Sequence, residues 1–212
     1  MKMALEEEGY EKVAYVKDLD PAKLGEIDVL LISSVKRYPK AWDLGQVKTW
    51  QRQWVESGKG LVLFHESVGW RAPAFKEVPP FPEIGRGVAL GAKGDLWAPV
   101  QRTDMVPAER EHPITRTLPA AFKMQYDSAP MLPGPQGRAL VLLKREAVVR
   151  GADYTLDKDY AALIVGTLGK GRVVLFGPLA GQALKPREME KSPTGGELQM
   201  MLNSILWAAG KL

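Results

Sequence analysis

A short apolar run that ends in polar, reactive side chains is the feature that most constrains this chain. Residues 61–64 are all apolar, and His65, Glu66 and Ser67 follow at once. An unbroken run of this length is typical of a strand buried on both faces, as in a parallel sheet. In open α/β folds, ligands bind beyond the carboxyl ends of such strands. The run therefore predicts an α/β sheet with a small-molecule site beside His65.

Composition is that of an ordinary globular chain and excludes several classes of chemistry. The 212 residues are 45% hydrophobic and 25% charged, which suits one domain over residues 1–212. The net charge is +4 and the basic residues are scattered, so no nucleic-acid partner is expected. Without cysteine there is no disulfide framework, thiolate zinc site or cysteine nucleophile. No apolar run approaches a membrane span and no apolar signal region opens the chain, so we expect a cytoplasmic protein with no membrane partner.

Two helices and several short strands are expected around the first run. Capping-box pairs followed by apolar residues at helical spacing predict helices over residues 43–58 and 194–210. Apolar runs predict strands at residues 10–16, 27–32, 61–64, 139–143, 161–165 and 172–176. Residues 27–65 would form a βαβ unit, and the last two strands a hairpin. The proline-rich stretch 71–135 indicates long ordered loops over the strand ends.

Two histidines are the leading candidates for proton transfer, because histidine titrates near neutral pH. His65 is either a catalytic group at the strand end or a core histidine with a backbone partner. Glu66 joins it only if the chain turns after His65, since neighbouring residues of a strand face opposite ways. His112 and Asp127 lie in the expected loops, and we expect them to position a substrate or a water. We further expect both histidines to line one pocket, with Glu66 or Asp127 within reach of an imidazole.

Ser67 has two interpretations. The sequence His65-Glu66-Ser67-Val68-Gly69 matches the second half of a G-x-S-x-G nucleophile elbow, with histidine in place of the first glycine. Ser67 would then be a nucleophile. A serine after a strand also commonly caps a short following helix, which is the more frequent outcome.

Metal and cofactor signals are weak. Both histidines together with Asp127, Glu66 or Asp104 could ligate a divalent metal, but no HxH or HExxH spacing supports such a site. The glycines at 85, 87 and 91 have the wrong spacing for a dinucleotide fingerprint, and prolines precede them instead of a strand. No organic cofactor is expected.

An ordered set of segments resembles the trehalose-utilisation (ThuA-like) family, which has the class I glutamine amidotransferase-like fold. The set comprises residues 27–32, 55–58, 60–65, 112–115 with 118–119, 169–174 and 202–209. The resemblance implies a flavodoxin-like three-layer sandwich with a mostly parallel central sheet and long loops over its carboxyl edge. It also implies that His65 stands at the elbow where amidotransferases carry a cysteine. The family's leading strand and its histidine after the last strand have no counterpart in this chain, where residues 177–182 follow that strand.

The resemblance implies a role in carbohydrate metabolism, which leaves three functions open. The first is a hydrolase or sugar-modifying enzyme that uses His65 for acid/base chemistry on a small carbohydrate-like molecule. The second is an ester or lactone hydrolase with Ser67 as its nucleophile. The third is a non-catalytic sugar-binding domain. Because the absent leading strand would expose a sheet edge, we also expect a homodimer.

Overall fold

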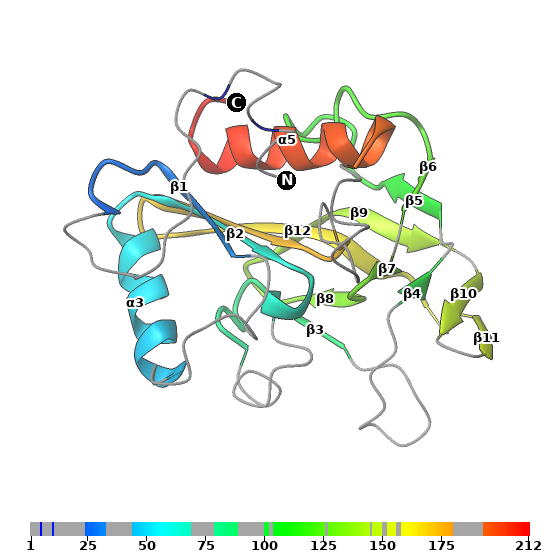
Figure 1. The fold of residues 1–212 in the computed structure, drawn as a ribbon, viewed down its shortest axis with the longest axis horizontal. Coiled ribbons are helices and arrows are strands. Elements are labelled where there is room, and N and C mark those ends of the chain that lie inside the picture. Colours follow the sequence, from blue (N-terminus) through cyan, green and yellow to red (C-terminus); the bar gives the residue numbers. More distant parts are fainter. Residues whose placement is uncertain are drawn as a thin grey trace, which may run out of the picture.

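A mixed sheet of nine strands forms the body of the protein (Figure 1). The computed structural model describes Leu5, Tyr10 and residues 24–32, 44–68, 79–88, 100–101, 104–125, 127–144, 146–149, 152–155, 158–179 and 193–212. The main path of the sheet runs β1 (Val29–Ile32), β2 (Gly60–Phe64), β13 (Gly171–Phe176), β12 (Tyr160–Leu168), β9 (Arg138–Lys144), β5 (Asp104–Pro107) and β6 (Phe122–Lys123). β3 (Gly85–Gly87) and β8 (Met131–Pro133) branch from β12.

The expectation of a mostly parallel sheet is wrong. Within the described residues, the parallel pairs are β2 with β1 on one side and β2 with β13 on the other. All other described strand pairs are antiparallel, including the predicted hairpin of β12 and β13. The signal was misleading because β9 and β12 lie inside the sheet, where burial on both faces produces the same apolar runs that parallel strands show. The fold is therefore a mixed α/β fold, and the flavodoxin-like sandwich is not confirmed.

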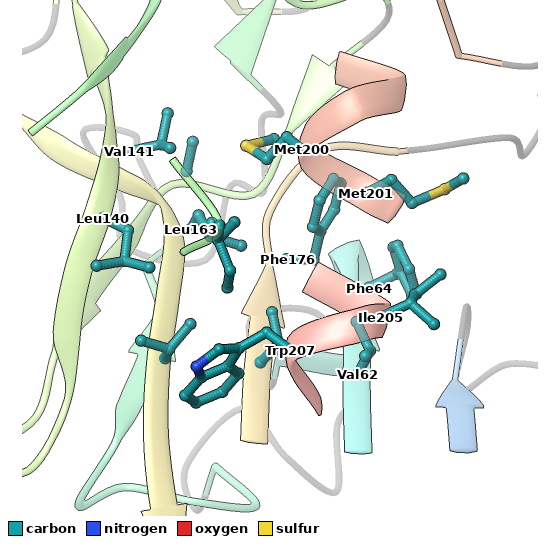
Figure 2. Close-up of a cluster of buried hydrophobic side chains, with 14 of the residues drawn as sticks. Val62, Phe64, Leu140, Val141, Leu163, Phe176, Met200, Met201, Ile205 and Trp207 are labelled. Atoms are coloured by element: carbon teal, nitrogen blue, oxygen red, sulfur yellow. The ribbon is translucent and has the colours of Figure 1, made fainter. Parts of the chain in front are cut away.

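β2 is buried along its whole length between β1 and β13, and every one of its residues is apolar or glycine. Side chains alternate between the two faces of a strand. Val62 and Phe64 accordingly belong to the core cluster beneath α5 (Gly195–Ala208), while Leu61 and Leu63 pack in the cluster beneath α3 (Leu44–Glu56). Figure 2 shows the first cluster, in which the rings of Phe64 and Phe176 lie 4.9 Å apart.

The helix α5 runs antiparallel to β2 and β13. Met200 and Met201, near the middle of the helix, lie toward the tips of these two strands, and Trp207, near its end, lies toward their starts (Figure 2). A Cβ on Gly60, the first residue of β2, would meet the carbonyl oxygen of Ala208 at 2.5 Å. The carboxyl end of α5 is thus fixed against the amino end of the sheet.

The two predicted helices are confirmed, but one capping box is wrong. The helix α3 is followed by Gly58 at φ 105°, the left-handed conformation that glycine adopts without strain. Thr194 is the N-cap of α5, yet its side chain makes no capping bond. Glu197 instead accepts the backbone N–H of Gln125 at 2.7 Å, and the Gln125 amide bonds to the Thr194 hydroxyl. Tertiary contact to another segment has replaced the local cap.

The middle of the chain is more than a set of loops. Its described residues supply β3, β5, β6 and β8 to the main sheet and form a small pair of β4 (Val100–Gln101) with β7 (Asp127–Ser128). A second small pair joins β10 (Glu146–Val149) and β11 (Ala152–Thr155). Strands of two to four residues carry too little periodicity to be recognised in sequence, which is why this region was predicted as loops.

Two expectations stay predictions. Apart from Tyr10, the strand expected at residues 10–16 lies outside the described residues, so the homodimer argued from an exposed edge is untested. None of the described helices is long and apolar enough to cross a membrane.

Candidate functional site

A strained turn at the carboxyl end of β2 is the clearest candidate for a functional site. His65 follows the last residue of β2 and begins the 3₁₀-helix η2 (His65–Val68). Its φ of 46° is left-handed, a conformation uncommon for any residue other than glycine. Side chains held in such conformations cluster at active sites, where the surrounding structure maintains the strain. Strand, strained residue and helix in succession are the elements of an elbow that presents one side chain at a sheet edge.

Ser67 lies in the same turn and carries a second unusual feature. The side chain is 1% exposed, and its Oγ has no hydrogen-bond partner within the part of the chain that the structure describes. An unsatisfied buried hydroxyl costs about 1–3 kcal/mol. Ser67 lies within η2, and residues 69–78, where a following helix would run, lie outside the described residues. A buried polar group at a strained strand end is a feature that a ligand or a water could satisfy.

The end of β13 and the strand β7 lie beside this turn. Phe176 pairs with Phe64, so Gly177 and Pro178 extend next to His65 at the same edge of the sheet. Ser128 forms a bridge with Pro178, and a Cβ on Gly177 would meet the Ser128 Oγ at 2.6 Å. The backbone of β7, which includes Asp127, therefore lies near the carboxyl edge. The side chains of Asp127 and Glu66 lie outside what the structure describes.

His112 lies elsewhere, at the amino end of the sheet. Its ring centroid is 5.5 Å from that of Trp207 on α5, and the guanidinium of Arg172 lies 5.0 Å from the same tryptophan ring. Arg172 pairs with Gly60, the first residue of β2. A strand rises about 3.3 Å per residue, so the two ends of β2 are roughly 13 Å apart. The structure therefore does not bring His112 to His65.

The surroundings of His112 are those of a structural residue. Its Nδ1 accepts the backbone N–H of Ile114 at 3.2 Å, and its carbonyl accepts the N–H groups of Thr115 and Arg116. The side chain is 8% exposed. Burial, reinforced by the charge of Arg138, lowers the pKa of His112 below its ordinary value of 6.5. The imidazole is therefore neutral at physiological pH and acts as a fixed acceptor within its own turn.

The expectation of one pocket lined by both histidines is wrong. It failed because the residues around His112 do not lie at the carboxyl edge of the sheet. They pack on α5 at the amino end of the sheet instead. The two histidines cannot share one metal ion across this separation. Among the described side chains, no three of histidine, aspartate or glutamate lie close enough to hold a metal, but Glu66 and Asp127 are not among them. The structure keeps His65 and Ser67 together, with the backbone of Asp127 at the same edge.

Sequence reasoning missed the residues that shape this edge from outside the elbow. Ser128 is fully buried, and Gly177 allows β7 to approach β13 closely. A glycine directly after a buried strand was the available signal for Gly177. Nothing in the local pattern marked Ser128, because its place depends on a bridge to a segment fifty residues away in the sequence.

Comparison with known proteins places this α/β fold among the ThuA-like proteins. No protein-family model and no curated protein matches the sequence. A ThuA-like protein from Parabacteroides merdae has a solved structure that matches with a TM-score of 0.66 and 18% identity, over 100% of this chain and 84% of its own. A ThuA-like protein from Bacteroides uniformis matches with a TM-score of 0.59 and 18% identity, over 88% and 71%. The cytoplasmic protein STM3548 from Salmonella typhimurium matches with a TM-score of 0.62 and 13% identity, over 97% and 84%. The chain has the fold of these proteins, which confirms the ThuA-like resemblance at the level of the fold.

Proposed function

We propose that this protein is an enzyme that acts on a small carbohydrate-like molecule, with His65 as its general acid or base. The left-handed backbone of His65 between β2 and η2 is the observation that carries the proposal. A non-glycine residue is maintained there at an energetic cost, although glycine would fit without strain. A histidine held in that conformation at a strand end is best explained by a task for its imidazole.

Proton transfer is the task that an imidazole performs most readily. A positioned histidine typically contributes 10²–10⁴ to the rate of a reaction by giving or taking a proton in the transition state. The neighbouring groups at this edge are the hydroxyls of Ser67 and Ser128, both buried. Hydroxyl and imidazole groups are suited to hydrogen-bond the hydroxyls of a sugar or to orient a water. This complement supports hydrolysis or another proton-dependent change of a polyhydroxyl substrate.

The carbohydrate class rests on the ThuA-like resemblance. Two of the matching structures are described as ThuA-like. The resemblance of the sequence to that family implies a role in carbohydrate metabolism. Fold alone does not define a reaction. The substrate class is therefore the part of the proposal that most needs a direct test.

Hydrolysis of an ester or lactone through Ser67 is the second candidate. The buried Oγ of Ser67 favours it, because among the described residues this hydroxyl has no hydrogen-bond partner that would compete with a substrate. In this mechanism the Oγ forms a bond to the carbonyl carbon while a nearby base takes its proton. The alcohol then leaves with that proton, and water releases the acyl group from the serine.

A substrate panel with two variants separates these candidates. Wild-type protein, His65→Gln and Ser67→Ala are assayed with δ-gluconolactone, p-nitrophenyl acetate and neutral disaccharides. If His65 is the acid or base, the turnover rate of His65→Gln should be about 10²–10⁴-fold lower than that of the wild-type protein. Ser67→Ala should retain most of it, and a serine-directed phosphonate should not label the protein.

Each other outcome has a distinct meaning. Loss of turnover in Ser67→Ala together with phosphonate labelling of Ser67 would replace the lead candidate with the second. Binding of a sugar without turnover of any substrate would establish the binding-domain alternative. His112→Asn serves as the matched control, since His112 lies at the other end of the sheet and should leave turnover at pH 7.5 unchanged.

A further inference from the structure

The segment 108–121, which joins β5 to β6, is attached to α5 at Asn203 and Trp207. Figure 1 shows it beside the helix, above the sheet. The ring of His112 contacts Trp207 at 5.5 Å between centroids, with an angle of 53° between the ring planes. Asn203 donates to the carbonyl oxygen of Ile114 at 2.8 Å and to the Thr117 hydroxyl at 3.1 Å. The apolar side chains of Ile114 and Leu118 are also buried in the same core cluster as Trp207, so the segment packs on the helix as well as making these polar contacts.

The attachment at His112 requires a neutral imidazole. The Nδ1 atom of His112 accepts the backbone N–H of Ile114, so the proton of the ring is on Nε2. A protonated imidazole has N–H groups at both nitrogens and accepts no hydrogen bond. Binding of one proton would therefore break the Ile114 bond and place a buried positive charge near Arg138 and Arg172.

The charged groups around His112 oppose that proton. Arg138 on β9 and Arg172 on β13 face it from the sheet, while α5 presents the uncharged Trp207. Among the described residues, Glu109 on the same segment is the anion that favours the proton, and it is already ion-paired with Arg138. The other charged side chains of the segment near His112 are exposed: Arg110, Glu111 and Arg116. Burial and the two guanidinium groups lower the pKa of His112 more than Glu109 raises it.

We propose that the contact of His112 with Trp207 is an acid-sensitive latch, in which a proton on His112 releases residues 108–121 from α5. The released histidine is solvated and binds a proton near pH 6.5, whereas the latched histidine binds it only at lower pH. The open form therefore binds more protons in this range. The latch is closed above about pH 6.5 and opens progressively as the pH falls below that value. This proposal does not depend on the proposed function.

Hydrogen exchange at residues 108–121 tests the latch directly. Protection factors are compared between pH 7.5 and pH 5.0 for wild-type protein and for His112→Asn, whose side-chain oxygen can accept the Ile114 N–H and does not titrate. Wild-type protein should lose protection in this segment, by about tenfold for each unit by which folding lowers the pKa. His112→Asn should show no such loss, and His65→Gln, which removes the other histidine, should behave like wild type.

Two results would overturn the latch. The first is protection of residues 108–121 that does not change with pH in the wild-type protein. The second is an equal loss of protection in His112→Asn. If His112→Asn does not fold, the imidazole signals of wild-type protein, assigned with His65→Gln, are followed by NMR from pH 8 to pH 5. Protonation of His112 without a change at the Trp207 indole signal would then also contradict the proposal.

Discussion

The two histidines of this protein stand at opposite ends of the same strands and differ in how the fold holds them. At the amino end, His112 accepts a hydrogen bond within its own turn, packs on Trp207 and has a lowered pKa. At the carboxyl end, His65 has a left-handed backbone and lies two residues before Ser67, whose buried hydroxyl has no partner among the residues that the structure describes. Both are buried, so burial alone does not separate a structural from a functional histidine. The proposed function instead distinguishes them by backbone strain and by the hydrogen bonding of the neighbouring polar groups.

The largest expected effect is at the amino end, where Trp207 joins α5 to the segment of His112. Trp207→Ala should destabilise the protein by about 3–5 kcal/mol, because a buried aromatic side chain and its contacts with His112 and Arg172 are lost. Denaturation with urea measures this value. Trp207→Phe retains a ring and should cost clearly less. An equal loss of stability in both variants would show that the aromatic contact does not stabilise the attachment of α5 to the segment of His112.

A matched pair of glycines sharpens the comparison between the ends. A Cβ on Gly177 would meet the carbonyl oxygen of Ala129 at 2.5 Å, and a Cβ on Gly60 would meet that of Ala208 at the same distance. Either change to alanine should cost about 1–3 kcal/mol through overpacking. Only Gly177→Ala should also reduce turnover, because it displaces β7 beside His65. If Gly60→Ala folds normally but loses turnover, the amino end of the sheet would matter for activity as well, which would contradict a site confined to the carboxyl end.

Substitutions at His65 test the strained backbone itself. Asparagine tolerates the left-handed region, whereas a β-branched residue does not. His65→Asn should therefore be more stable than His65→Val by about 1–2 kcal/mol, although burial alone would favour valine. Thermal unfolding of both variants gives the comparison. A more stable valine variant would mean that position 65 does not adopt the φ of 46° described here.

The smallest expected effect is the dependence of global stability on pH. The pKa of His112 is lowered in the folded state, so the unfolded chain binds more protons below pH 6.5. Its contribution to stability is complete above about pH 6.5 and is lost as the pH falls toward the folded-state pKa. His112→Asn should have a flatter stability profile between pH 5 and pH 7. The same slope in both proteins would assign the effect to other groups.

The sequence predicted the elements with strong local signals and missed those that depend on distant partners. β2, β13, α3 and the elbow at His65 follow from apolar runs, caps and an abrupt change to polar residues. The direction of the strands was not encoded in those runs, because a buried antiparallel strand such as β12 is as apolar as a parallel one. The place of His112 could not be predicted, since it depends on Trp207, almost a hundred residues away. The unused cap at Thr194 has the same cause, as Glu197 bonds to Gln125 instead.

The central claim is that the carboxyl-end histidine has a function and the amino-end histidine a structural role. Measuring turnover and pH-dependent stability side by side in His65→Gln and His112→Asn tests it most directly. The account predicts that the turnover rate of His65→Gln falls by about 10²–10⁴-fold, while the pH dependence of its stability stays that of the wild-type protein. His112→Asn should keep turnover at pH 7.5 and lose that pH dependence. Full turnover in His65→Gln, or its loss in a folded His112→Asn, would contradict the account.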